Sequence, residues 1–552
     1  MKLRQIVFGV LLVLPILGFY YLHGYWVTNT PLQDDFDGLL HPATLWQSMP
    51  QSISSTWELL TTQDDERRVI LNRLVAISIT EAMGYLDFRW MKWVGLFLNF
   101  ILVGLLVDLI RVNRWSWWTL VPAILLLYSN ANYGALHWGM IPVQQIGVFV
   151  WGILALWAAS RGHGFLAVVA GCLSLASDVS GVLILPAGLI TLALRRDWRL
   201  FGLWFLGIGL AVFGYMHGLE VPAYRPSLLQ NLQEWPSLLG MVWISPGLFL
   251  DIWLDSPLTF RIAWVAVFST VGWYVLIKLT IPSLQTWWKK GTITSQESWI
   301  LGVLAFLIGT LLIFALGRAS EGISSIFDSR YRHIFHLFVL FIWFLVGIKG
   351  QYKHMLPWVV SGGIIWYGWV LWITWGYFDF QRQVHLTDMY AWHHQRGMPN
   401  TGIYYSMQTE VDRVIEEAEK WNVYRPADFP FAPLATAQVS GKAQAQWINV
   451  TPTGRAVEFM GQPRGFGKDQ GNYLVLKSSQ TSYILPIRYA RQRSWKSFFP
   501  SRYYMPTGQS ILIQNHMLKP GKYEVFLGIP KGNGWSLLET HLTFEPTPSA
   551  GG

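Results

Sequence analysis

The sequence predicts a polytopic α-helical membrane protein that carries a mainly-β domain at its C-terminal end. Of the 552 residues, 52% are hydrophobic and only 13% are charged, whereas soluble proteins carry about 25% charged residues. Apolar runs long enough to cross a bilayer recur from residues 6–27 to residues 356–377. Beyond residue 378 no such run remains. We therefore expect about eleven transmembrane helices followed by an extramembrane domain.

Basic residues predict which side of the membrane each loop occupies. The expected spans are 6–27, 93–110, 117–128, 141–159, 165–176, 182–194, 200–216, 258–279, 299–316, 335–348 and 356–377. The even-numbered spans end at Arg111, Arg114, Arg161, Arg195, Arg196, Lys289, Lys290, Lys349 and Lys353. The positive-inside rule then places the N-terminus in the cytoplasm and the C-terminus outside. We expect a multi-pass protein of a bacterial inner membrane, with a periplasmic or extracellular C-terminal domain.

The same topology predicts the domain organisation. The membrane domain, residues 1–378, has its long loops outside, at 28–90, 218–256 and 317–333. Residues 67–83 have the apolar spacing of a helix lying in the membrane interface. An α-rich connector is expected at 379–434, because 410–421 has helical charge spacing. Alternating runs at 474–476, 482–485, 511–513, 523–527 and 541–544 predict a β-sandwich over 435–552.

Composition also excludes several classes of protein. Cys172 is the only cysteine, so there is no intrachain disulfide and no cysteine-based metal site. The net charge of +9 indicates topology and contact with anionic lipid or phosphate. No basic surface interleaved with aromatic residues, as in nucleic-acid-binding modules, is present. We expect membrane lipids and no nucleic acid among the partners.

The first candidate site is an acid cluster at the point where the first span meets the first loop. Asp34, Asp35 and Asp37 fall within four residues there. A carboxylate at such a place can accept a proton from a hydroxyl, and two can share a cation. We expect Asp34 or Asp35 to be a catalytic base. A solvated helix cap, and a divalent cation (Mg²⁺ or Mn²⁺) held by Asp34 and Asp35, are the alternatives; the cofactor requirement stays open.

The second candidate site is a basic group in the expected external loop 317–333 and at the start of the next span. It comprises Arg318, Arg330, Tyr331, Arg332 and His333. Arginines on the external face oppose the positive-inside trend, and guanidinium groups match phosphate oxygens. We expect these residues to bind a phosphate, while lipid headgroups or the loop acids are alternative partners. Supporting residues on the same face are Asp37, Glu66, Arg67, His137, Tyr224 and Arg225. The alternative for Glu66 and Arg67 is a charged helix N-terminus, and for His137 it is a hydrogen-bonded histidine at the membrane interface. For Tyr224 and Arg225 the alternative is a solvated loop.

Three short motifs resemble the GT-C superfamily of integral-membrane glycosyltransferases, including uncharacterised bacterial members. They are Asp34-Asp35-Phe36 after the first span, the interfacial helix from Arg67, and Ser329-Arg330-Tyr331 after Gly317-Arg318. The resemblance implies a polyprenyl-phosphate-linked sugar as donor, an external active site and a first-loop acid as base. A Trp-Trp-Asp-Tyr-Gly motif is absent, which argues against oligosaccharyl transfer to asparagine. The acceptor, a glycan or a lipid, stays open.

Two other classes of protein compete with this interpretation. One is a polysaccharide or lipid transporter, or a non-catalytic component of envelope assembly. Ionisable residues within the expected spans are few, which argues against an ion-coupled carrier. The other is a polysaccharide polymerase or ligase, for which we would expect a large external loop late among the spans. Residues 317–333 form only a short one.

Overall fold

A computed structural model describes residues 2–50, 52–223, 225–254, 256–400, 409–451, 454–460, 471–489, 509–515, 518–532 and 534–546. The chain divides into two compact units. The helical unit comprises Met1–Tyr21, Ser48–Ile79 and Trp90–Leu371, and the C-terminal unit comprises Leu22–Gln47, Thr80–Arg89 and Trp372–Gly552. The first loop is therefore shared between the units, and part of it folds with the C-terminal end of the chain.

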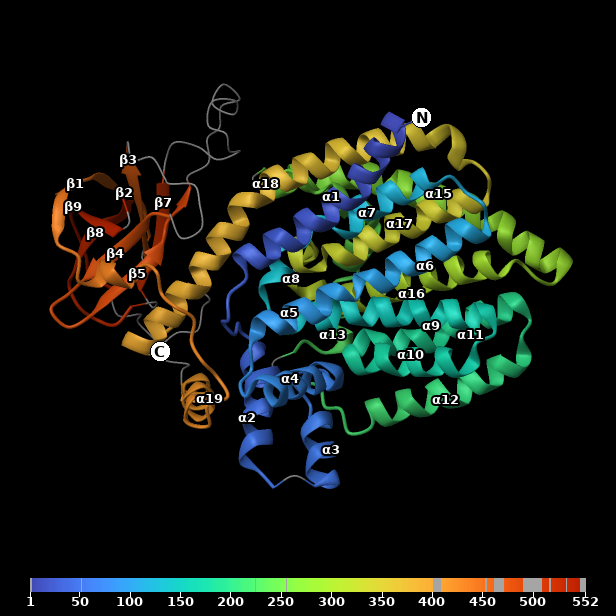
Figure 1. Cartoon of the computed structure of the whole chain (residues 1–552), viewed down its shortest axis with the longest axis horizontal. Coiled ribbons are helices and arrows are strands. Elements are labelled where there is room, and N and C mark those ends of the chain that lie inside the picture. The colour runs from blue at the N-terminus through green and yellow to red at the C-terminus, as the bar shows by residue number, and fades with distance from the viewer. Residues whose placement is uncertain are drawn as a thin grey trace. The chain divides into compact units, whose positions relative to one another are not determined.

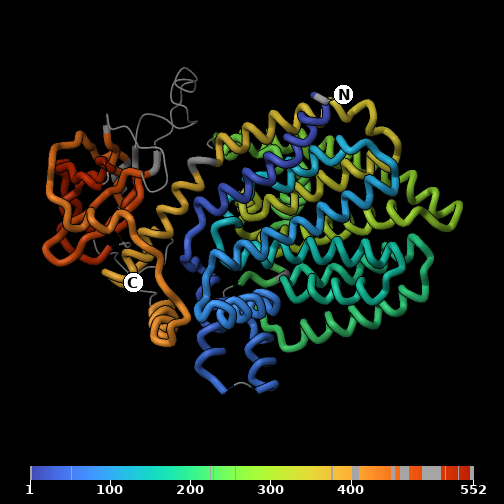
Figure 2. The backbone as a smooth tube through the Cα atoms, viewed as in Figure 1, coloured from blue at the N-terminus to red at the C-terminus, as the bar shows by residue number. Residues whose placement is uncertain are grey.

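The helical unit is a bundle of long apolar helices that run side by side (Figures 1 and 2). Among the described residues, eight segments are long and apolar enough to cross a membrane. They contain α1 (Lys2–Trp26), α5 (Phe88–Phe97) with α6 (Asn99–Val112), α9 (Gly147–Arg161), α12 (Trp198–Met216), α15 (Leu258–Lys290), α16 (Ser295–Arg318), α17 (Arg332–Ile348) and α18 (Tyr352–Gln395). The chain is thus a mostly helical protein built for a membrane.

Three of the eleven expected spans are shorter than the rest. Helix α10 (Gly164–Ser177) is apolar, and so is the segment made by η5 (Val179–Leu183) and α11 (Ile184–Arg195). Both are shorter than the eight segments described above. Helix α7 (Leu120–Leu127), preceded by η2 (Trp117–Thr119), has only eight residues. A bilayer-crossing helix needs about 20 residues. The count of eleven is therefore supported for eight segments only.

The second long loop contains helical structure that the sequence analysis did not anticipate. Helix α13 (Leu228–Gln233) begins at a capping box in which Ser227 and Gln230 satisfy each other's backbone N–H groups. Helix α14 (Trp235–Ile244) and η6 (Ser245–Leu250) together form another short apolar segment.

The remaining loops between the long helices contain short helical elements. The first loop holds η1 (Phe36–Leu40), α2 (His41–Ser48), α3 (Ile53–Thr61) and α4 (Ile70–Met83). Between α7 and α9 lie η3 (Asn130–Asn132), α8 (Tyr133–His137) and η4 (Pro142–Ile146). The loop before α17 contains η7 (Ala319–Glu321), η8 (Ile323–Phe327) and η9 (Ser329–Tyr331). The expected interfacial helix at 67–83 thus corresponds to α4.

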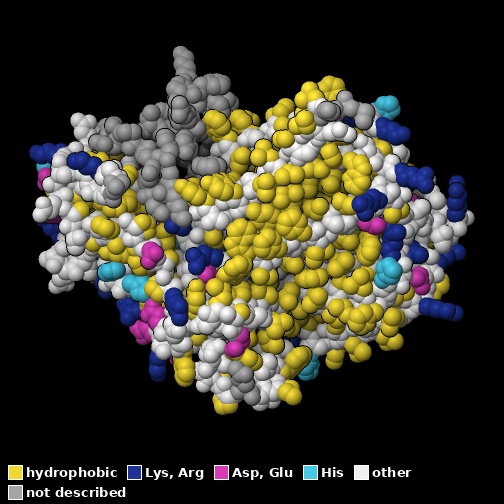
Figure 3. Space-filling model, in the orientation of Figure 1, with side chains coloured by type: hydrophobic (Ala, Val, Ile, Leu, Met, Phe, Trp, Pro, Cys, Tyr) yellow, Lys and Arg dark blue, Asp and Glu magenta, His cyan; other side chains and the backbone are white. Residues whose placement is uncertain are grey.

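The outer surface of the bundle has the character of a lipid-facing belt. Yellow apolar side chains form a broad band along its flank in Figure 3. Helix α12 contributes Leu203, Phe205, Leu206, Leu210 and Phe213, each more than half exposed. Dark blue Lys and Arg side chains gather towards the right-hand end of the same view. Helices α9 and α17 are, in contrast, largely buried inside the bundle. The apolar flank indicates contact with membrane lipids.

The C-terminal unit contains a sandwich of two sheets. Strands β1 (Val439–Lys442), β9 (Gly534–Phe544), β8 (Tyr523–Lys531), β4 (Tyr473–Lys477) and β5 (Ser482–Pro486) form one sheet in that order. Strands β2 (Gln444–Thr451), β3 (Gly454–Met460), β7 (Gln509–Gln514) and β6 (Arg488–Tyr489) form the other. β1 pairs parallel to β9, and the other described pairs are antiparallel. All five expected strand segments lie in observed strands.

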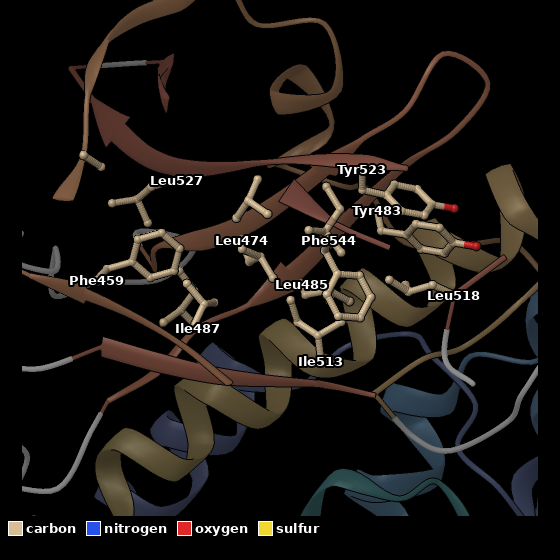
Figure 4. Close-up of a cluster of buried hydrophobic side chains, with 14 of the residues drawn as sticks. Phe459, Leu474, Tyr483, Leu485, Ile487, Ile513, Leu518, Tyr523, Leu527 and Phe544 are labelled. Carbon is tan, nitrogen blue, oxygen red and sulfur yellow. The ribbon is translucent and has the colours of Figure 1, made fainter. Parts of the chain in front are cut away.

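Alternating side chains explain why the five-stranded sheet is buried on both faces. Leu474 and Leu476 of β4 point into the core between the sheets, together with Leu527 and Ile513 (Figure 4). Their neighbours in the strand point the other way, because successive strand residues face opposite sides. On that second face, Tyr473, Val475, Ile484, Phe526 and Leu537 pack against Leu386 and Tyr390 of α18 and against Phe431 and Leu434 near η11 (Ala432–Ala435). The end of α18 is therefore a core element of this unit.

Candidate functional site

The acid motif, Asp34, Asp35 and Asp37, lies on an unusual stretch of backbone. Gln33 has φ of 44°, in the left-handed region that non-glycine residues seldom adopt. The next residues enter η1, a π-helical turn that begins at Phe36. Positive φ and π-turns both cost free energy and are frequent at functional sites. The surroundings therefore hold this turn in a conformation that the local sequence alone does not favour.

The three carboxylates of the motif have different environments. Asp35 is completely buried, and its Oδ2 accepts a hydrogen bond from the Leu32 N–H at 3.0 Å. Asp34 is half-buried, while Asp37 is exposed. A base must be reachable by the hydroxyl that it deprotonates. Asp34 meets that condition better than Asp35, whose carboxylate supports the fold of its own turn.

Asp37 has charged neighbours from the far end of the chain. Partial desolvation raises the pKa of Asp37 above its ordinary value, and the carboxylate of Glu410 raises it further. Asp34 acts in the same direction, whereas His41 and Arg413 oppose the shift. Glu410 and Arg413 both belong to α19 (Thr409–Lys420). The electrostatics of the acid motif are therefore set partly by the C-terminal segment.

In the helical unit, Arg318 and Arg330 lie close to the aromatic rings of Trp138, Phe314 and Tyr331, and we call these five side chains the arginine stack. The Cζ atom of Arg330 lies 5.7 Å from the ring centroid of Trp138 and 4.9 Å from that of Tyr331. Arg318 lies over Tyr331 at 5.6 Å and over Phe314 at 5.5 Å. Stacking covers the faces of a guanidinium group and leaves its N–H donors along the edge. Two of the expected phosphate-binding arginines thus lie close to the same ring, that of Tyr331.

Each stacked arginine also has a carboxylate neighbour close in sequence. Arg318 Nη1 lies 2.8 Å from Glu321 Oε2, and Arg330 Nε lies 2.9 Å from Asp328 Oδ2. Each of these contacts uses one nitrogen of a group that has five N–H donors. Acidic residues of the loop therefore do pair with these arginines, as one of the alternatives expected from the sequence. This pairing does not exhaust their capacity to bind an anion.

An ion-pair network joins the stack to the first loop. Arg225 lies 2.9 Å from both Asp65 and Glu66, and its Nη1 is 3.9 Å from Glu321. Glu321 is also the partner of Arg318. Three segments that are far apart in sequence therefore meet here. The expected supporting residues Glu66 and Arg225 lie next to the expected phosphate-binding group.

The turn around His137 packs against the same loop. Helix α8 contacts η9, and the Gly134 N–H donates to Ser329 Oγ at 3.2 Å. A Cβ atom at position 134 would collide with that hydroxyl, so glycine permits the close approach. His137 is buried at the end of α8, next to Trp138 of the stack. His137 is therefore placed beside the arginine stack.

Arg332 and His333 are directed elsewhere. Arg332 Nη2 and Arg261 Nη2 each lie 2.6 Å from Asp251 Oδ2, and all three side chains are largely buried. His333 is buried, and its ring centroid lies 6.2 Å from that of Phe149 in α9. These contacts bind the start of α17 into the bundle. Arg332 and His333 therefore contact Asp251 and Phe149, respectively, whereas Arg318 and Arg330 contact the rings of the stack and Glu321 and Asp328.

We expect Asp251→Asn to destabilise the helical unit by about 3–5 kcal/mol, because it leaves two buried guanidinium groups without their counter-charge. Arg332→Ala should also lower the thermal unfolding temperature in detergent, since it removes one partner of the carboxylate. Affinity for a polyprenyl phosphate should change less than stability in both variants. The exposed control Arg199→Ala should change neither quantity. If Arg332→Ala is stable but binds polyprenyl phosphate more weakly, Arg332 belongs to the phosphate site and the prediction is wrong.

Tyr224 is outside the described residues. Among the described residues, no group of three or more His, Cys, Asp and Glu side chains is placed to hold a metal ion. The acid motif belongs to the C-terminal unit and the arginine stack belongs to the helical unit.

Comparison with known proteins adds no relative: no family model, no curated protein and no solved structure matches the chain. Sequence reasoning missed Trp138, Phe314 and Glu321 as members of the site. Glu321 had a usable signal, because it stands three residues after Arg318 at the spacing of a helical ion pair. The two aromatic residues had none, because apolar spans and their edges contain many such side chains.

Proposed function

We propose that the protein is a membrane glycosyltransferase that moves a sugar from a polyprenyl-phosphate donor to a glycan or lipid acceptor. In this proposal the reaction takes place at the external face of a bacterial inner membrane, with the N-terminus in the cytoplasm. The observation that carries it is the arginine stack. Two guanidinium groups lie against the ring of Tyr331, and each uses one nitrogen of its edge in a contact with a carboxylate. Such edges match the oxygens of a phosphate carried by a membrane lipid.

The proposed chemistry assigns one task to each group. The carboxylate of Asp34 takes the proton of the acceptor hydroxyl, and the hydroxyl oxygen forms a bond to the anomeric carbon of the sugar. The bond between that carbon and the phosphate oxygen breaks, and the phosphate leaves with the negative charge. Arg318 and Arg330 stabilise this charge through hydrogen bonds from their edges.

Two linked measurements test the proposal. Lipids that co-purify with the protein should include a polyprenyl-phosphate-linked sugar, identified by mass spectrometry. Proteoliposomes supplied with polyprenyl-phosphate-linked radiolabelled hexoses should transfer label to an added glycan or lipid fraction. Absence of transfer with every donor, from protein that binds polyprenyl phosphate, would contradict the enzymatic proposal.

One observation favours a second candidate, a polysaccharide or lipid transporter. The buried group formed by Asp251, Arg261 and Arg332 places ionisable side chains inside the bundle. Such groups are a feature of transport pathways. Movement of a lipid-linked glycan across the proteoliposome membrane, without any change in its covalent structure, would favour this function.

A further inference from the structure

A helix from the C-terminal segment of the chain packs against the turn that carries the acid motif. Helix α19 packs against η1, the turn that carries Asp37. Both elements bury apolar side chains: Val414, Ile415 and Ala418 of α19, and Phe36, Leu39 and Leu40 of η1. The two elements lie in the same compact unit although some 370 residues separate them in sequence. Burial of these side chains fixes the turn relative to α19.

Asn29 ties three segments together five residues before Asp34. Its side-chain Nδ2 donates to the Arg425 carbonyl, and its Oδ1 accepts from the Phe88 N–H, both at 2.9 Å. Its own carbonyl accepts from the Tyr424 hydroxyl at 3.1 Å. Asn29 is buried, so each of these bonds is costly to lose. The chain entering the acid motif is therefore anchored to the residues that follow α19.

Helix α19 also brings opposite charges to the motif. Glu410 and Arg413 are the charged groups of α19 that act on Asp37, and Asp34 and His41 act on it from its own segment. Glu410 and Arg413 are both exposed. Substitution at either position should therefore change the electrostatics without removing a core contact.

We propose that α19 is a positioning element for the acid motif: its packing against η1 sets Glu410 and Arg413 beside Asp37, and the hydrogen bonds of Asn29 to the residues that follow α19 fix the turn that carries Asp34. This inference rests on the proposed glycosyl transfer for its consequence in catalysis. The C-terminal domain is then an integral part of the reactive unit. It is neither a mere cover nor only a platform for the acceptor.

The charges of α19 provide a test that needs no substrate. Carbodiimide reacts with protonated carboxyl groups, so labelling of Asp37 in the full-length protein, read by mass spectrometry across pH, reports its protonation. Glu410→Gln removes a negative neighbour and should move the labelling midpoint to lower pH. Arg413→Gln removes a positive neighbour and should move it to higher pH. Glu416→Gln, on the same helix but paired with Arg396 at 2.9 Å, should leave the midpoint unchanged.

The opposite signs distinguish an electrostatic role from a structural one. Loss of structure in α19 would move both variants in the same direction. Equal or absent shifts in Glu410→Gln and Arg413→Gln would overturn the inference. This result does not depend on glycosyl transfer, so failure of the proposed function and failure of the inference are separable.

Transfer measurements then test Asn29 as a positioning residue. Asn29→Ala should lower the transfer rate by about 10²-fold, the cost of a small displacement of reacting groups. Asn29→Asp keeps the acceptor for Phe88 but loses the donor to Arg425, and it should lose less activity. Donor KM should stay nearly constant in both variants, because the arginine stack is untouched. Full activity of a folded Asn29→Ala protein would overturn the positioning role.

Discussion

Replacing Asp34 by Asn is expected to lower the rate of glycosyl transfer by about 10²- to 10⁴-fold, the contribution of a general base. The substitution keeps the size and shape of the side chain but removes its ability to take a proton. Asp34 is half-buried and lies at a strained turn after Gln33, so the new amide should occupy the same place. The measurement is the initial rate of label transfer in proteoliposomes, with stability followed by thermal unfolding.

Two variants serve as controls for this result. Asp428→Asn removes an exposed carboxylate of the same unit and should leave transfer unchanged. Asp35→Asn alters the carboxylate that accepts the Leu32 N–H, so it should lower stability more than Asp34→Asn does. If Asp35→Asn abolishes transfer in a stable protein while Asp34→Asn stays active, the base is Asp35. If both stay active, neither residue is the base.

Replacing Asp37 by Asn should have a small effect on stability, opposite in sign to that of Asp35→Asn. Because the pKa of Asp37 is raised in the folded protein, its contribution to stability is present at acid pH and is lost as pH rises through the raised pKa. Asp37→Asn should therefore leave stability unchanged or slightly increase it at neutral pH. At acid pH the two proteins should have the same unfolding temperature.

Hydrophobic pattern alone predicted most of the architecture. Eight expected spans correspond to eight long apolar helices, and the strands around Leu474, Ile484 and Val525 were visible as short runs between turn residues. The pattern is less decisive for the short spans, where helical structure is present but its length stays below that of the eight long segments. Residues 117–128 are apolar enough for a span, but the α-helix there begins at Leu120 and ends at Leu127, which leaves only eight residues.

The candidate site was harder to predict, because its members meet only through tertiary packing. Chemistry singled out Asp34, Arg318 and Arg330, since charges near membrane spans are costly and conspicuous. Chemistry did not indicate that Arg332 turns towards Asp251, which lies 81 residues away. Nor did it indicate that Asn29 bonds to Arg425 across nearly 400 residues. Such contacts depend on which segments the fold brings together, and no local pattern reports that.

Arg330→Ala is expected to raise the KM for the polyprenyl-phosphate donor by about 10- to 100-fold, because a hydrogen bond to a charged group contributes about 1.5–3 kcal/mol. Arg330→Lys should be intermediate, since lysine keeps the charge but loses the fork and the stacking on Trp138 and Tyr331. Binding of a synthetic polyprenyl phosphate, measured separately from acceptor KM, locates the effect on the donor.

The chain offers a matched control for this prediction, and the control determines what the result means. Arg161 also stacks on a tryptophan, Trp157 at 5.9 Å, and pairs with a carboxylate, Asp108 at 2.6 Å. Arg161→Ala therefore removes the same kind of contacts away from the stack, and it should leave donor affinity unchanged. If Arg330→Ala weakens donor and acceptor binding equally, or if Arg161→Ala weakens donor binding as much, the loss comes from general destabilisation. The arginine stack would then have no specific role in holding phosphate.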